Sequence, residues 1–229
     1  MENHLDGVKR MGTRTNFDSN LTHLKELLME MAELSKIAVE AAIEALISQN
    51  TENAEKVVRN DREIDELDLH INEKAMLLIA TESPVASDLR TIISVLKISS
   101  EIERIADNAV NIAKSALHIG KEKHIKEIKD IPVMKDLALE MLDCSLKSLF
   151  LKDAAMAAEC AKIDDQVDEM YGRLVHELLG YIPGNPGATN QIAQMAFTCR
   201  YIERIGDHCT NIAEQVVYLV TGKQSELNR

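Results

Sequence analysis

Acidic residues at helical spacing could form an oxygen-rich ligand face in each half of this chain. Glu103, Asp107 and Asn111 follow one another at intervals of four residues. Residues four apart lie on the same side of an α-helix, so these side chains predict one stripe of carboxylate and amide oxygens. About a hundred residues later the same three residue types recur as Glu203, Asp207 and Asn211. Self-similarity at a fixed period indicates that the chain is built from two copies of one unit.

A second pair of acids precedes each stripe. Asp61 and Asp65 are four residues apart, and Asp164 and Asp168 are their counterparts in the second copy. If each pair lies on a helix antiparallel to the following acidic helix, the two pairs can face one another. Four carboxylates would then converge on one exposed face of each half.

Converging carboxylates have two interpretations. Acidic residues on helices usually form solvated faces, and like charges four residues apart cost only about 0.2 to 0.5 kcal/mol on an exposed helix. The recurrence of both pairs in both copies favours metal binding instead. Carboxylate and amide oxygens suit hard cations such as Mg²⁺, Mn²⁺ or Ca²⁺, and also iron. His208 follows Asp207, but its counterpart Asn108 is no equivalent ligand, so we expect the histidines to be incidental.

A metal-dependent enzyme, either an oxidase or a phosphohydrolase, is the alternative from another class. Helix bundles with di-iron sites carry Glu-x-x-His motifs, and this sequence contains none. It also lacks a P-loop and a Gly-x-Ser-x-Gly nucleophile motif. We therefore expect no catalytic residues and no enzymatic activity.

The elements that must position these acids are expected to be helices throughout. The four prolines separate long segments of helical periodicity. Ser83 and Pro84 have the form of an N-cap followed by proline at the first helical position. The six expected helices span residues 21–48, 53–80, 84–117, 132–150, 153–181 and 188–220.

The fold class is therefore all-α, with two tandem three-helix bundles related by internal duplication. The expected boundaries are an N-terminal extension at 1–20, a first bundle at 21–119, a charged connection at 120–131, a second bundle at 132–221 and a C-terminal tail at 222–229.

Composition limits the environment and the partners. The formal net charge of -12 argues against nucleic acid as a partner. Residues 1–20 lack the apolar stretch of a signal peptide, and no run of about 18 apolar residues could insert into a membrane. The four cysteines lack metal-ligand spacing and are expected to be free buried thiols in a reducing compartment. These features predict a cytoplasmic protein.

The sequence resembles the PhoU family of phosphate-uptake regulators. The likeness rests on the duplicated segments Glu103-Arg104-Ile105-Ala106-Asp107 and Glu203-Arg204-Ile205-Gly206-Asp207. It also includes the segment from Ser83 to Arg90, which is similar to the family's Pro-x-x-x-Asp-Leu-Arg element. The second copy has Ala188-Thr189-Asn190-Gln191 at the corresponding place, without that element.

The resemblance implies a function and a set of site residues. Members restrain the phosphate-starvation response by linking the phosphate ABC transporter, through its ATPase, to a sensor histidine kinase. Members are commonly dimeric, and some bind iron or zinc clusters through paired acidic motifs. By that likeness one cluster would use Asp61, Asp65, Glu103 and Asp107, and the other Asp164, Asp168, Glu203 and Asp207. Asp88 and Arg90 would contact a partner.

Overall fold

The computed structural model describes the backbone of residues 2–227, with side chains from Phe17 onward, and this part of the chain contains helices and no strand. The α-helices are α1 (Glu2–Ser48), α2 (Thr51–Glu82), α3 (Ser87–Ile119), α4 (Asp130–Leu151), α5 (Ala154–Ala161), α6 (Asp164–Gly180) and α7 (Thr189–Thr221). Two short 3₁₀ helices, η1 (Ile182–Gly184) and η2 (Pro186–Ala188), join α6 to α7. The predicted all-α fold class is confirmed.

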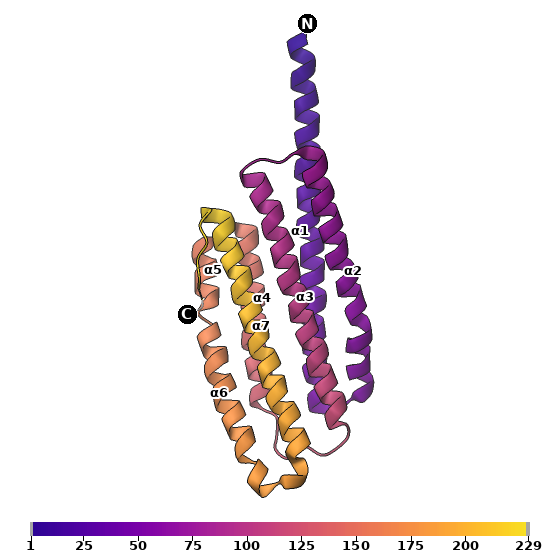
Figure 1. Ribbon diagram of the computed structural model, residues 1–229, viewed down its shortest axis with the longest axis vertical. Helices are drawn as coiled ribbons and strands as arrows, with labels where there is room; N and C mark the ends of the chain where they lie inside the picture. The colour runs from indigo at the N-terminus through magenta and orange to yellow at the C-terminus, as the bar shows by residue number, and fades with distance from the viewer. Residues whose placement is uncertain (1, 228–229) are drawn as a thin grey trace.

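The helices form two lobes side by side (Figure 1). The first lobe contains α1, α2 and α3, and the second contains α4 to α7. The lobes pack mainly through α3 and α7, which lie next to each other in the centre of the molecule. Both central helices bury isoleucines at helical spacing, namely Ile98, Ile102, Ile105 and Ile112 on α3 and Ile202, Ile205 and Ile212 on α7. This periodicity explains why the two copies share one continuous core.

Three helix boundaries differ from the sequence prediction. The first helix begins at Glu2 and not near residue 21, because residues 2–20 contain no proline to stop it, and its N-terminal end extends beyond the bundle (Figure 1). Ser83 is the C-cap of α2 in the left-handed conformation (φ 48°, ψ 55°), where its N–H donates to Ile79 O (3.3 Å). Pro84 therefore lies in a connection, and α3 begins at Ser87.

The middle helix of the second lobe is also different. One helix over residues 153–181 was predicted, but the structure divides it into α5 and α6. At the break the Ile163 N–H donates to Cys160 O (3.2 Å) and the Gln166 N–H donates to Ile163 O (3.0 Å). Hydrogen bonds to the third residue back are those of a tighter 3₁₀ turn, which shifts the following residues around the helix axis. The side chain of Asp164, the first residue after this turn, therefore points in a different direction than it would in one continuous helix.

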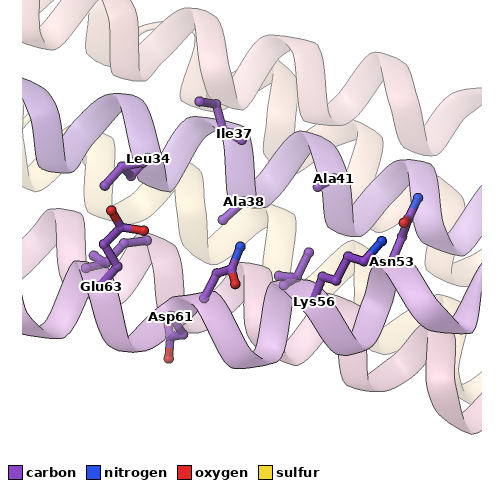
Figure 2. A pocket seen from close by; sticks show the side chains of 11 residues that line it. Leu34, Ile37, Ala38, Ala41, Asn53, Lys56, Asp61 and Glu63 are labelled. Atoms are coloured by element: carbon purple, nitrogen blue, oxygen red, sulfur yellow. The ribbon is translucent and has the colours of Figure 1, made fainter.

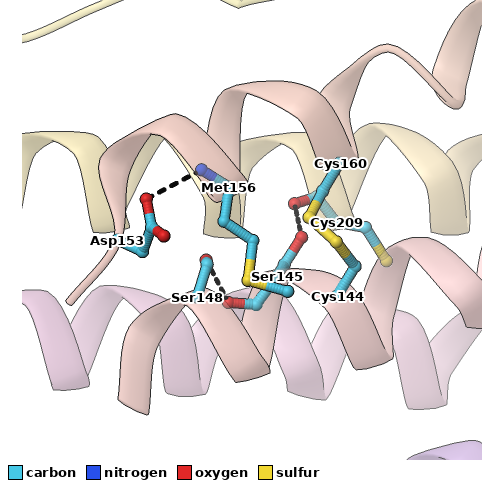
Figure 3. Close-up of a disulfide and its surroundings, with 7 residues drawn as sticks. All are labelled: Cys144, Ser145, Ser148, Asp153, Met156, Cys160 and Cys209. Atoms are coloured by element: carbon cyan, nitrogen blue, oxygen red, sulfur yellow. Dashed lines mark hydrogen bonds between the residues drawn. A yellow bond between two sulfur atoms is a disulfide. The ribbon is translucent and has the colours of Figure 1, made fainter. Parts of the chain in front are cut away.

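A disulfide joins α4 to α5 (Figure 3). It connects Cys144 to Cys160, whereas Cys199 and Cys209 are free and buried. The expectation of four free thiols is therefore wrong for the first two. The bonded cysteines come from neighbouring helices with Cα atoms 5.8 Å apart, a proximity that their sequence spacing does not reveal.

We expect iodoacetamide to modify two cysteines, Cys199 and Cys209, when the chain is denatured without reductant, and all four after reduction. Reduction should also lower the free energy of unfolding by about 3 kcal/mol, the value typical of a bridge closing a loop of this size. Mass spectrometry of the alkylated chain and urea unfolding measure the two effects. Modification of all four thiols before reduction would contradict the bridge.

None of the helices in residues 2–227 is both long enough and apolar enough to cross a membrane.

Candidate functional site

The first acidic cluster lies where α2 packs against α3. Burial raises the pKa of Asp61 to about 6, and repulsion from Asp65 and Asp107 acts in the same direction. Desolvation, followed by repulsion from Asp107 and Asp68, raises the pKa of Asp65. The pKa of Glu103 is raised first by burial and then by the same neighbours. The structure thus brings Asp107 within reach of the charges of Asp61, Asp65 and Glu103.

Asp68 adds a fifth carboxylate beside this cluster. It comes from α2 and accepts a hydrogen bond from the Ser99 hydroxyl on α3. Its other oxygen accepts from Asn72 Nδ2 at 3.0 Å. These bonds fix the position of Asp68, so its charge adds to a preorganised acidic surface and is not free to turn away.

The second cluster, between α6 and α7, is arranged differently. Burial raises the pKa of Glu203 to about 7, and repulsion from Asp207, Asp168 and Asp164 adds to this shift. The pKa of Asp207 is raised by burial and then by Asp168. Arg200 lies against Glu203 Oε1 and stacks on Tyr171, the residue that replaces Asp68 in the repeat. A cation of the protein itself therefore partly neutralises this cluster.

Asp164 turns into the interior of the second lobe. It is 1% exposed, and its Oδ2 accepts a hydrogen bond from Thr210 Oγ1 (3.1 Å). A Cβ on Gly206 would lie 2.7 Å from Asp164 Oδ1, so the carboxylate occupies the space that a side chain would fill. The first lobe has Ala106 and Val110 at these positions, and Asp61 stays partly exposed. The prediction of an exposed acidic face is therefore wrong for Asp164, and also for Glu203, which is 8% exposed.

The fit of a metal ion to these residues follows from the donor set. Among the residues with described side chains, no group of three or more His, Cys, Asp or Glu is already placed to hold a metal ion. Carboxylates that raise one another's pKa would nevertheless be stabilised by a cation between them. In the second lobe Glu203 Oε2 is buried and has no hydrogen-bond partner among the described residues. The donors are of the type that hard cations prefer. The side chains would have to move closer together to coordinate an ion, and Asp164 would also have to change its orientation.

A buried polar contact between the lobes was missed by sequence reasoning. His208 Nδ1 on α7 lies 2.8 Å from Glu101 Oε2 on α3, and Asn211 Nδ2 donates to the same oxygen at 3.0 Å. Burial by itself would raise the Glu101 pKa, but the hydrogen bonds from His208 and Asn211 outweigh it, so the pKa is lowered. An ionised carboxylate can only accept, so His208 Nδ1 carries the proton. The sequence offers one signal for this contact, which is that the two copies differ at both positions. The second copy has Tyr201 in place of Glu101, and the first has Asn108 in place of His208.

The predicted partner residues lie near the start of α3. Asp88 is in the first helical turn and is partly buried. The Arg90 guanidinium stacks on Tyr218 of α7, 5.7 Å from the ring centroid. It also approaches the backbone of Gly222, so Arg90 already packs against the second lobe. Of these two, Asp88 is therefore the better probe of an external contact.

Two tandem helical bundles with acidic residues at corresponding positions define a duplicated helical-bundle protein. The model of the PhoU domain matches residues 28–116 and 131–216, one match in each lobe. The chain belongs to the PhoU family.

Individual relatives agree over nearly the whole chain. It is 38% identical to a phosphate-specific transport system accessory protein PhoU homolog from Clostridium acetobutylicum, over 94% of this chain and 99% of the relative. A homolog of the same description from Aquifex aeolicus is 37% identical, over 89% and 92%. The crystal structure of PhoU from Pseudomonas aeruginosa superposes with a TM-score of 0.86 at 32% identity, covering 90% of this chain and 100% of that one.

Proposed function

We propose that the protein is a metal-binding cytoplasmic regulator that restrains phosphate uptake and the phosphate-starvation response. It would act as a homodimer that couples the ATPase of the phosphate ABC transporter to a sensor histidine kinase, without catalysing a reaction. The observation that carries this proposal is the match of both lobes to the PhoU domain. Relatives aligned over most of their length are named accessory proteins of the phosphate-specific transport system.

The acidic clusters supply a means of regulation in this proposal. The first lobe would hold a cation with Asp61, Asp65, Glu103 and Asp107, and the second with Asp168, Glu203, Asp207 and a reoriented Asp164. Iron or zinc is favoured by the family resemblance, and Mg²⁺, Mn²⁺ or Ca²⁺ by the oxygen donors. The bound ion would neutralise repelling carboxylates and so stabilise the contacts of α2 with α3 and of α6 with α7.

Deletion of the gene should leave phosphate-starvation genes expressed when phosphate is plentiful, because the restraint on the kinase is lost. Transcript measurements in the deletion strain and in a complemented strain test this. Normal repression in the deletion strain would contradict the regulatory role. Oxidase and phosphatase assays on the metal-loaded protein distinguish the regulator from a metal-dependent enzyme. Measurable turnover would support the enzyme.

The same proposal predicts salt-dependent binding to the ATPase or the kinase. The net charge of -12 favours basic partner surfaces, and exposed charges are screened beyond about 8 Å at physiological ionic strength. Pull-downs at low and high salt should use wild-type protein and Asp88→Ala. Asp165→Ala is the matched control, because Asp165 is also an acid in the first turn of a helix.

A further inference from the structure

A groove of about 280 Å³ opens between α1 and α2 on the first lobe (Figure 2). Its apolar lining consists of Leu34, Ile37, Ala38, Ala41, Val57 and Ile64. Figure 2 shows Lys56 and Glu63 extending from α2 toward the space between the helices. Asp61 also lines the groove, and its carboxylate points away from α1.

The matching positions of the second lobe carry larger or cross-linked residues. When Asp61 is matched with Asp164, Ala38 corresponds to Met141, which is 0% exposed. The same match places the disulfide between Cys144 and Cys160 where the first lobe has Ala41 and Val57. The groove in the first lobe therefore lies where the first copy has smaller residues than the second copy.

The surface beside the groove is acidic. Glu33, Ile37, Glu40 and Glu44 follow one another at intervals of four, three and four residues, so they form one exposed stripe along α1. Ile37 in this stripe is 49% exposed. The nearby lysines are already engaged: Lys36 Nζ lies 2.6 Å from Asp143 Oδ2, and Lys56 Nζ lies 3.1 Å from Glu52 Oε1.

Charge decides between the possible occupants. A second copy of the chain docked through α1 would place one glutamate stripe against another, and like charges across an interface are unfavourable. A partner helix with apolar residues on one side and lysines or arginines beside them would complement both the apolar lining of the groove and the glutamate stripe. Binding of an amphipathic helix in an apolar groove is a recurring mode of recognition.

We propose that the groove between α1 and α2 binds a basic amphipathic helix of a partner protein. Its apolar side chains would enter the groove over Ala38 and Ala41, and its basic side chains would face Glu33, Glu40 and Glu44. The proposal adds a surface that the regulatory role does not specify, and it does not involve Asp88.

The test is binding of a fluorescein-labelled helical peptide of leucine and lysine, with leucines at i, i+3, i+4 and i+7, measured by anisotropy on the full chain. Ala38→Met should weaken binding at least about tenfold, because the longer side chain fills the groove. Ala80→Met is the matched control, since Ala80 is exposed on α2, and it should leave binding unchanged. Equal binding to wild-type protein and Ala38→Met would overturn the proposal.

The charge requirement is tested separately. Glu40→Lys should weaken peptide binding about fivefold, whereas Glu73→Lys, the same change at an exposed site farther along α2, should have little effect. Equal weakening by both would show non-specific attraction to an acidic protein and would overturn the proposal. So would failure of the peptide to bind wild-type protein. Loss of self-association in Ala38→Met, measured by sedimentation, would assign the groove to a second copy instead.

Discussion

Replacing Glu101 with alanine should lower the free energy of unfolding by about 3 kcal/mol. The Glu101 carboxylate is the hydrogen-bond acceptor for His208 and Asn211 at the contact of α3 with α7. His208 is 8% exposed, so the substitution would leave a buried polar ring without its partner. Removing one member of such a buried pair costs more than removing an exposed charge. Urea unfolding monitored by circular dichroism measures the change.

A double-substitution cycle checks the assignment. Glu101→Ala and His208→Ala together should cost less than the sum of the single changes, because the second removes a group that the first left unpaired. Since the folded pKa of Glu101 lies below the unfolded value of 4.5, its contribution is fully present above that pH. It is lost as the pH falls through the folded pKa. A loss below about 0.5 kcal/mol in Glu101→Ala would show that the contact does not hold the lobes together.

The bound metal should fall by about half when Glu103 and Asp107 are both replaced with alanine. These residues supply two of the four proposed ligands in the first lobe, while the second lobe is untouched. Helical circular dichroism should be nearly unchanged, because substitutions of partly exposed residues usually alter stability by less than about 0.5 kcal/mol. Elemental analysis of protein purified without chelator gives the metal content. Glu63→Ala with Glu66→Ala on α2 is the control for a simple loss of two charges.

Acid should remove the metal from the same protein. A ligand must be deprotonated to bind a cation, and the pKa values of about 6 for Asp61 and about 7 for Glu203 mean that protons compete near neutrality. Metal content should therefore decline as the pH is lowered from about 7 to about 5. For the preceding prediction, an unchanged metal content at neutral pH in the variant with Glu103→Ala and Asp107→Ala would show that these two acids only form a solvated helix face.

Much of the architecture could be predicted because it depends on local pattern. The matching spacing of Glu103 with Asp107 and of Glu203 with Asp207 predicts the duplication, and the apolar periodicity predicts helices. Each pattern lies within one helix, so it can be interpreted without knowing which helices touch. The convergence of Asp61 with Asp107 needed only the further assumption that neighbouring helices are antiparallel.

The features that were missed depend on contacts between distant segments. Asp164 turns inward because Gly206 leaves space and Thr210 offers a hydroxyl, and both residues lie on another helix. The contact of Glu101 with His208 requires α3 to pack on α7, which neither repeat shows by itself. In each case the sequence shows that the two copies differ at these positions, but only the packing of the helices shows which contact results.

The inward position of Asp164 affects how fast an ion could exchange in the second lobe. If both lobes bind ions, the first can exchange its ion with solvent directly, because Asp61 is already partly exposed. The second must first release Asp164 from Thr210 and draw it out over Gly206, which adds an opening step to both capture and release. One lobe would then follow rapid changes in ion concentration, while the other would retain its ion after the concentration had fallen. With ions bound in both lobes, the duplicated chain would therefore respond to a change in ion concentration at two different rates.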